Sequence, residues 1–181
     1  MSTPLLVLLV IIAVAVIYYI SLYNKIIRLQ TTRENAFSDI DVQMKMRFDL
    51  VDNLVNTVKG YAKHEKSTLN DIIEARNKFA TAKNMKEKAD ANNQVSSALK
   101  SIFALAESYP DLKANQNFLQ LQNELSDIEN KIAAARRFFN ATTKEYNTTI
   151  QQFPANVLFH KTSETFFEGE EVIKKAPKVE F

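Results

Sequence analysis

The side chains best suited to chemistry are two histidines, His64 and His160. A di-iron site in a helical protein takes Glu-x-x-His motifs from facing helices. Tyr61 and Val157 stand three residues before the histidines, so neither has that motif. Zinc needs three or four His, Cys or carboxylate ligands, and the chain has no Cys. We therefore expect no metal and no cofactor.

Nucleophilic catalysis is equally poorly supported. A catalytic Ser, Cys, Thr or Lys needs an adjacent base, and neither a Gly-x-Ser-x-Gly motif nor a Gly-rich phosphate loop is present. Asp39 and Asp41 are two positions apart, about 200° around a helix, so they cannot bind one ion. We predict that the protein is not an enzyme and has no small-molecule substrate. An enzyme with an atypical carboxylate site is the alternative.

The elements that carry these residues follow from the scarcity of glycine. The chain has 181 residues but only two Gly and four Pro. Tight hairpin turns between strands need residues with positive φ, which are mainly Gly. The composition therefore predicts an all-α fold. The formal net charge of +2 gives no sign of nucleic-acid binding.

Residues 1–23 carry no charged side chain, so all 23 Lys+Arg and 21 Asp+Glu lie beyond them. Leu5–Leu22 is apolar except for Ser21 and spans about 27 Å as a helix, which fits a hydrocarbon core. We predict a transmembrane anchor over 1–23. A signal peptide cleaved near Ala13-Val14-Ala15 and a buried core helix are the alternatives. The bilayer is the first predicted partner.

The residues that follow the span predict how it sits in the membrane. Tyr18, Tyr19 and Tyr23 form an aromatic belt, and Lys25 and Arg28 lie where lipid headgroups are expected. With Arg33, these cations predict a single-pass protein with its N-terminus outside and its C-terminal domain in the cytoplasm.

Beyond the span, long stretches without Gly or Pro have apolar residues at helical spacing. They predict helices near 24–62, 64–82, 90–109 and 112–153, which form an antiparallel cytoplasmic bundle over 24–153. Three long helices are the alternative, because Gly60 could be a turn, a kink or neither. The polar stretch 81–93 is the predicted hairpin between the second and third helices.

Two apolar seams should form the core of this bundle. The first runs over Phe37, Ile40, Met44, Val51, Leu54, Val55, Val58 and Ala62. The second runs over Phe118, Leu121, Leu125, Ile128, Ile132, Ala135, Phe139, Thr142, Tyr146, Thr149 and Phe153, in a helix that starts near Asp111 or Leu112. A seam of this kind can also recruit a second copy, so a homo-oligomer is a further expectation.

Five charged residues lie close to the seams: Asp41, Arg47, Asp49, Arg76 and Glu129. We interpret them as ion pairs between helices, with a partner-binding polar patch as the alternative. After Pro154 the pattern is lost, and 154–181 reads as an extended, partly disordered tail. Phe166 and Phe167 in this tail should either fold back on the bundle, dock a partner protein or contact the membrane.

Two segments carry a family resemblance. DIDVQMKMRFDLVDNLVNTVKGYAKHE, residues 39–65, and ESYPDLKANQNFLQLQNELSDIENKIAAARRFFNATTKEYNTTIQQFP, residues 107–154, resemble the signature of the bacterial LemA family. This resemblance implies a helical bundle anchored in the bacterial inner membrane, and it implies no reaction. Relatives in magnetosome membranes or encoded beside membrane proteases favour a non-enzymatic scaffold or adaptor. A regulatory partner of a membrane protease is the alternative.

Overall fold

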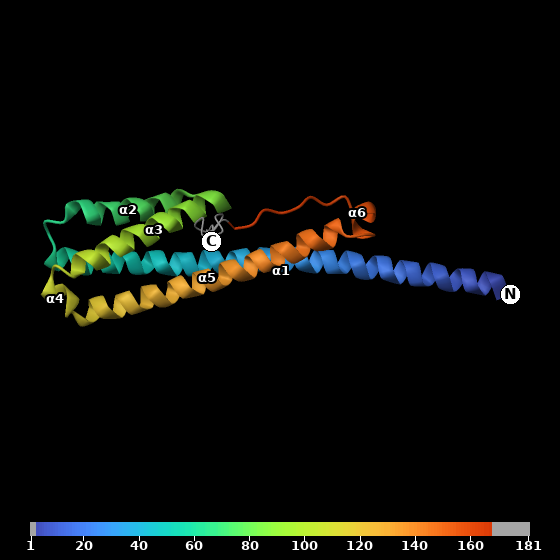
Figure 1. Ribbon diagram of the computed structural model, residues 1–181, viewed down its shortest axis with the longest axis horizontal. Helices are drawn as coiled ribbons and strands as arrows, with labels where there is room; N and C mark the ends of the chain where they lie inside the picture. The colour runs from blue at the N-terminus through green and yellow to red at the C-terminus, as the bar shows by residue number, and fades with distance from the viewer. Residues whose placement is uncertain (1–2, 168–181) are drawn as a thin grey trace, which may run out of the picture. The chain divides into compact units, whose positions relative to one another are not determined.

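The computed structural model describes residues 3–167, and this part of the chain is helical without strands (Figure 1). Four helices make up most of it. They are α1 (Thr3–Tyr61), α2 (Lys66–Thr81), α3 (Met85–Ala106) and α5 (Gln116–Gln151). The short helices α4 (Pro110–Lys113) and α6 (Ala155–Leu158) flank α5. The all-α prediction is confirmed, and the arrangement is the favoured one with four principal helices.

Gly60 lies inside α1, one residue before the helix ends, and its φ is not positive. The chain instead turns at residues 62–65, where the Glu65 N–H donates to the Ala62 carbonyl over 3.2 Å. Gly60 is therefore not the turn. No breaker interrupts α1, so the apolar N-terminal run and the first seam share one helix.

Residue contacts divide the chain into two compact units, and α1 and α5 each contribute to both. Unit 1 contains α1 up to Phe37 together with Phe138–Phe166. Unit 2 contains Ser38–Arg137, and of the described tail it includes Phe167. The predicted division into 1–23, 24–153 and 154–181 followed composition, which these contacts do not test. That division stays a prediction, and residues 168–181 of the tail lie outside the described part.

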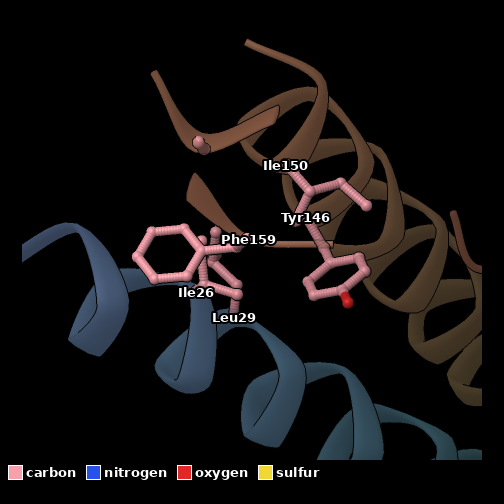
Figure 2. Packing of buried hydrophobic residues seen from close by; sticks show 6 residues of the cluster. Ile26, Leu29, Tyr146, Ile150 and Phe159 are labelled. Carbon is pink, nitrogen blue, oxygen red and sulfur yellow. The ribbon is translucent and has the colours of Figure 1, made fainter. Parts of the chain in front are cut away.

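Unit 1 has its own small core, where α1 packs against the end of α5 and the segment after it (Figure 2). This cluster contains Ile26, Leu29, Tyr146, Ile150, Ala155 and Phe159, with Leu22 packed against it. The Phe159 ring lies 5.1 Å from the Tyr19 ring and 5.8 Å from the Tyr23 ring. The core thus reaches the end of the apolar run of α1.

Unit 2 is a helical bundle in which α2 and α3 form an antiparallel hairpin (Figure 1). Its core contains the buried seam of α1, with Ile40, Met44, Val51, Leu54, Val55, Val58 and Ala62. Leu69 and Ile72 of α2, Val95, Leu99 and Ile102 of α3, and Phe118, Leu125 and Ile132 of α5 complete it. The predicted seams are confirmed over these positions.

Two predictions at the ends of the second seam were wrong. Phe153 is 82% exposed, because α5 ends at Gln151 and the heptad spacing has no meaning beyond the helix. At the other end, α4 separates residues 110–113 from α5, so the long helix does not start near Asp111 or Leu112. The Asn115 side chain accepts a hydrogen bond from the Phe118 N–H over 3.0 Å and caps α5 instead.

The hairpin between α2 and α3 is shorter than the polar stretch 81–93 that predicted it. The α3 helix already begins at Met85, and the Asn84 side chain caps it by accepting from the Glu87 N–H over 2.9 Å. Most of the polar stretch is therefore helix, as its Ala, Lys and Glu content allows.

Candidate functional site

The N-terminal part of α1 has the properties of a membrane span. Within residues 3–167, α1 is the one helix long and apolar enough to cross a bilayer, and none of its most apolar window is buried. Its large apolar side chains from Leu5 to Ile20 are exposed. A continuous exposed apolar surface of this size is unfavourable in water and suits a hydrocarbon environment. The helix is compatible with membrane anchoring.

The predicted interface residues lie just after this run. Tyr18, Tyr19, Tyr23, Lys25 and Arg28 are all exposed side chains of α1. Nothing tests their contact with lipid, so the membrane-interface assignment stays a prediction. The structure adds Phe159, which contacts two of these tyrosines and which the sequence reading left in the tail.

Arg33 holds the segment that follows α6 in place within unit 1. Its guanidinium pairs with the Glu164 carboxylate at 3.1 Å and donates to the Thr165 carbonyl oxygen and the Thr143 hydroxyl, each at 3.1 Å. Asn147 adds two hydrogen bonds of 2.8 Å to the backbone N–H and carbonyl of Glu164. Residues 159–166 are therefore bound in an extended course, although they form no regular element.

A buried polar cluster surrounds Arg47 in unit 2. The Arg47 guanidinium, only 3% exposed, pairs with the Glu129 carboxylate at 2.6 Å. It also donates to Asn92 Oδ1 at 2.9 Å and to the Ser96 hydroxyl at 3.0 Å. Burial lowers the pKa of Arg47, and the charge of Glu129 opposes that shift. The cluster joins α1, α3 and α5.

A cavity of about 270 Å³ opens beside this cluster. It is lined by Arg47, Lys100, Arg136 and Glu129, with Leu99, Phe103, Leu125 and polar side chains of α3 and α5. Among the described residues that line it, Glu129 is the one carboxylate, and it is paired with Arg47.

The other charged seam residues also pair between helices of unit 2. Asp41 pairs with Lys88 of α3, and Arg76 of α2 pairs with Asp52 of α1 at 2.9 Å. Asp49 is an exposed residue of α1. The ion-pair interpretation thus holds for Asp41, Arg47, Arg76 and Glu129. It did not identify their partners Lys88, Asp52, Asn92 and Ser96, whose polarity alone does not distinguish them from solvated helix residues.

The two tail phenylalanines have different surroundings. Phe166, in unit 1, is 47% exposed. Phe167, in unit 2, is 2% exposed, and the Arg136 guanidinium lies 5.0 Å from its ring centroid. Phe167 is thus packed on its own chain, as the fold-back reading expects. Partner docking by Phe166 and Phe167 stays a prediction.

The histidines are not drawn into any cluster. His64 and His160 are both exposed, and across residues 3–167 no group of three or more His, Cys, Asp or Glu side chains could hold a metal ion.

Comparison with known proteins agrees with this architecture. The sequence profile of the LemA family matches residues 36–181. Protein LemA of Metamycoplasma hominis is 29% identical over 144 residues, which cover 79% of this chain and 66% of that protein. Magnetosome protein MamQ of Magnetospirillum gryphiswaldense is 31% identical over 68 residues, covering 38% of this chain and 25% of that protein. The chain thus spans just under two thirds of the first relative and a quarter of the second. With its profile matched over most of its length, this all-helical chain with an apolar N-terminal helix belongs to the LemA family.

Proposed function

We propose that the protein is a membrane-anchored, non-enzymatic scaffold or adaptor. The apolar part of α1 crosses the bacterial inner membrane once, with the N-terminus outside, and unit 2 is presented in the cytoplasm. The observation that carries the proposal is the combination, in one unbroken helix, of an exposed apolar span and a seam that nucleates a helical bundle. Such a helix ties a protein-binding surface directly to a bilayer.

Unit 2 offers surface for self-assembly or partner binding. On the solvated side of α1, Val42 and Met46 are exposed and one helical turn apart. Single exposed apolar side chains are ordinary, but two at i and i+4 form a stripe on one helix face. This stripe is a suitable starting point for a helix–helix contact.

Two observations bear on the alternatives. Within residues 3–167, the lining of the cavity beside Arg47 has cations in excess and one carboxylate, which is paired, and this gives little support to an enzyme with a carboxylate site. A relative named as a magnetosome protein favours a role tied to a membrane structure. A regulatory partner of a membrane protease differs from a scaffold mainly in having one obligate partner.

Chemical crosslinking in native membranes tests the proposal. The full chain is crosslinked through its lysines, purified in mild detergent and examined by mass spectrometry. A scaffold gives crosslinks between copies of the chain or to several membrane proteins. One dominant foreign protein at constant stoichiometry supports the regulatory role instead.

A variant with Val42→Asn and Met46→Gln serves to locate the surface, because both side chains are exposed and the core is left intact. Replacing the exposed residues Ser97 and Asn123 with Gln is the matched control on other helices. Loss of crosslinks in the first variant alone places the contact on α1. A chain that remains monomeric and crosslinks to nothing contradicts the scaffold role.

A further inference from the structure

Residues 152–159, which follow α5 and include α6, form a turn that lies against the end of the apolar run of α1. Phe159 contacts the rings of Tyr19 and Tyr23. It also shares the small core with Ala155 and with Ile26, beside which Figure 2 shows it. A cavity of about 260 Å³ is lined from both sides, by Tyr18, Ser21, Leu22 and Lys25 of α1 and by Thr149 of α5 with Gln152, Phe153, Pro154 and Ala155 of the turn. The turn is therefore level with residues 18–26 of α1.

Three large apolar side chains lie on the outer surface of this turn, beside the exposed Gln152 and Asn156. Phe153 is 82% exposed, Val157 63% and Leu158 44%. Scattered apolar side chains on a protein surface need no explanation, but three large ones within six residues mark a contact surface. The inner residues of the same turn, Ala155 and Phe159, are buried in the small core with α1. The turn is therefore packed in a defined position, and its exposed apolar side chains are held there with it.

The segment is also uncharged. Between Glu145 and Lys161 the sequence contains no Asp, Glu, Lys or Arg. In the rest of the chain beyond residue 23 charged residues are frequent, so this gap resembles the membrane segment more than a solvated turn. An uncharged segment can enter the acyl-chain boundary more easily than a charged one, because charged side chains carry the largest insertion penalties.

The level of the turn fixes what it faces. If Leu5–Leu22 crosses the hydrocarbon core, which its length of about 27 Å permits, then residues 19–25 lie at the boundary between acyl chains and headgroups. Phe159 contacts α1 within that interval, and Lys161 follows where headgroups would be met. The apolar outer face of the turn is then turned toward lipid.

From this geometry we infer that the turn at residues 153–158 is a second membrane contact, which inserts Phe153, Val157 and Leu158 into the acyl-chain boundary of the leaflet where the span ends. The inference rests on the proposed membrane anchoring by α1. It extends that proposal, because two elements then bind unit 1 to the bilayer: a helix that crosses the membrane and a turn that inserts into one leaflet.

The sequence contains no Trp, so a single introduced Trp can serve as a fluorescent probe of its own position. Three variants of the full chain each carry one Trp: Phe153→Trp in the turn, Ile12→Trp in the middle of the span and Met46→Trp on the exposed face of α1 in unit 2. Each is reconstituted into vesicles whose phosphatidylcholine is brominated either near the headgroup end or near the methyl end of the acyl chain. Phe153→Trp should lose most of its emission to shallow bromines, Ile12→Trp to deep ones, and Met46→Trp to neither.

The outcomes separate the turn from the anchor. If Ile12→Trp is quenched and Phe153→Trp is not, the second contact is refuted while the anchor stands. If Ile12→Trp is not quenched, the anchoring itself is wrong. The Phe153→Trp emission could instead be blue-shifted and unquenched by bromine, with a shift that depends on the protein-to-lipid ratio. That result would show that a second copy of the chain covers the turn, and it would overturn the inference.

A further substitution tests the apolar face itself. Adding Val157→Ser and Leu158→Ser to Phe153→Trp should reduce shallow quenching, since both side chains are exposed and their loss leaves the core intact. Adding Leu119→Ser and Ala134→Ser, at exposed positions of α5 in unit 2, is the matched control and should leave the quenching of Phe153→Trp unchanged. Equal quenching in all three proteins contradicts the inference.

Discussion

Arg47 and Arg76 each pair with a carboxylate on another helix of unit 2, but in different surroundings. Arg47 is buried and also serves Asn92 and Ser96, and Asn92 is itself fully buried. Arg76 and its partner Asp52 are both more than a third exposed. Water competes for the second pair and is kept from the first, so removing each arginine should have unequal effects.

We predict that Arg47→Met lowers the free energy of unfolding by about 2–3 kcal/mol, because the substitution leaves the buried Asn92 side-chain oxygen without its donor and removes the cation paired with Glu129. The estimate is below that for a fully buried pair, since Glu129 is partly exposed and can be rehydrated. Chemical denaturation in detergent, followed by circular dichroism, measures the change.

The matched control is Arg76→Met, which removes an interhelical pair of the same type at the surface. It should cost no more than about 1 kcal/mol. Equal losses for the two variants would show that burial does not set the strength of these pairs.

At this scale the sequence predicted positions better than partners. The spacing of Arg47 and Glu129 beside apolar seams was enough to expect ion pairs between helices. It could not identify Asn92 or Ser96, because a polar residue on a helix is normally solvated, and only the approach of α1 and α5 to α3 buries these two.

The helix ends of unit 2 depend on short capping motifs. At the start of α3, Asn84 Oδ1 accepts from the Glu87 N–H, while the Glu87 carboxylate accepts from the Lys83 N–H over 2.7 Å. This reciprocal arrangement resembles a capping box, which satisfies backbone donors that the first turn of a helix leaves free. The capping motif, and no glycine, positions the α2–α3 turn.

Replacing the cap should therefore destabilise unit 2. We predict that Asn84→Ala costs about 1 kcal/mol, whereas Asn84→Ser retains most of the stability, because the Ser hydroxyl can accept the same hydrogen bond without placing a second carboxylate beside Glu87. Asn123→Ala, at an exposed position inside α5, is the control and should be neutral or slightly stabilising, since Ala favours helix. Thermal unfolding measures all three, and a cost at Asn123 as large as that at Asn84 would rule out capping as the cause.

The same motif gives a pH signature. The hydrogen bond from Lys83 lowers the pKa of Glu87 in the folded state. Its contribution to stability is therefore present above the unfolded carboxyl pKa of about 4.3 and is lost as the pH falls through the lower folded value. The difference in melting temperature between the native protein and Glu87→Gln should be constant above about pH 5 and shrink below about pH 4. A difference that does not change with pH would contradict the charged form of the cap.

Helices were predictable where periodicity is long, and their ends were not. The absence of Gly and Pro over whole blocks predicted α1, α2, α3 and α5, with Gly60 left open. The cap at Asn84 could have been predicted from the side chains alone, since Asn three residues before Glu is a known helix start signal. Asn115 has Phe118 three residues later, so it offers only the general preference for Asn at a helix start. Phe153 was misassigned because it continues the heptad in sequence after the helix has ended.

At the scale of the whole molecule, the sequence predicted an anchor and a bundle but not the grouping into units. Composition changes at residue 23, yet the contacts assign α1 up to Phe37 to unit 1 together with the end of α5. The grouping depends on Tyr146, Ile150 and Phe159, which lie far along the chain from Ile26. No local pattern encodes such long-range contacts, and for the same reason Phe159 was not expected beside Tyr19 and Tyr23.

Charge distribution makes a further prediction about the whole molecule, its orientation. Lys25 and Arg28 follow the span, so the positive-inside rule predicts that the C-terminal side stays in the cytoplasm. The chain has no Cys, and single substitutions therefore give labelling without background. In spheroplasts, a membrane-impermeant maleimide should label Thr3→Cys at once and Ser97→Cys only after lysis.

Reducing the charge tests the cause of this orientation. Lys25→Gln combined with Arg28→Gln should increase the fraction of Ser97→Cys that is labelled before lysis, because the bias set by these cations is weakened. Arg33 is left unchanged, since it binds Glu164 and Thr143 and its loss would also disturb unit 1. Replacing Lys63 and Lys66, exposed cations far from the span, with Gln is the control. Labelling of Ser97→Cys in spheroplasts of the otherwise native chain would reverse the proposed topology and place unit 2 outside the cytoplasm.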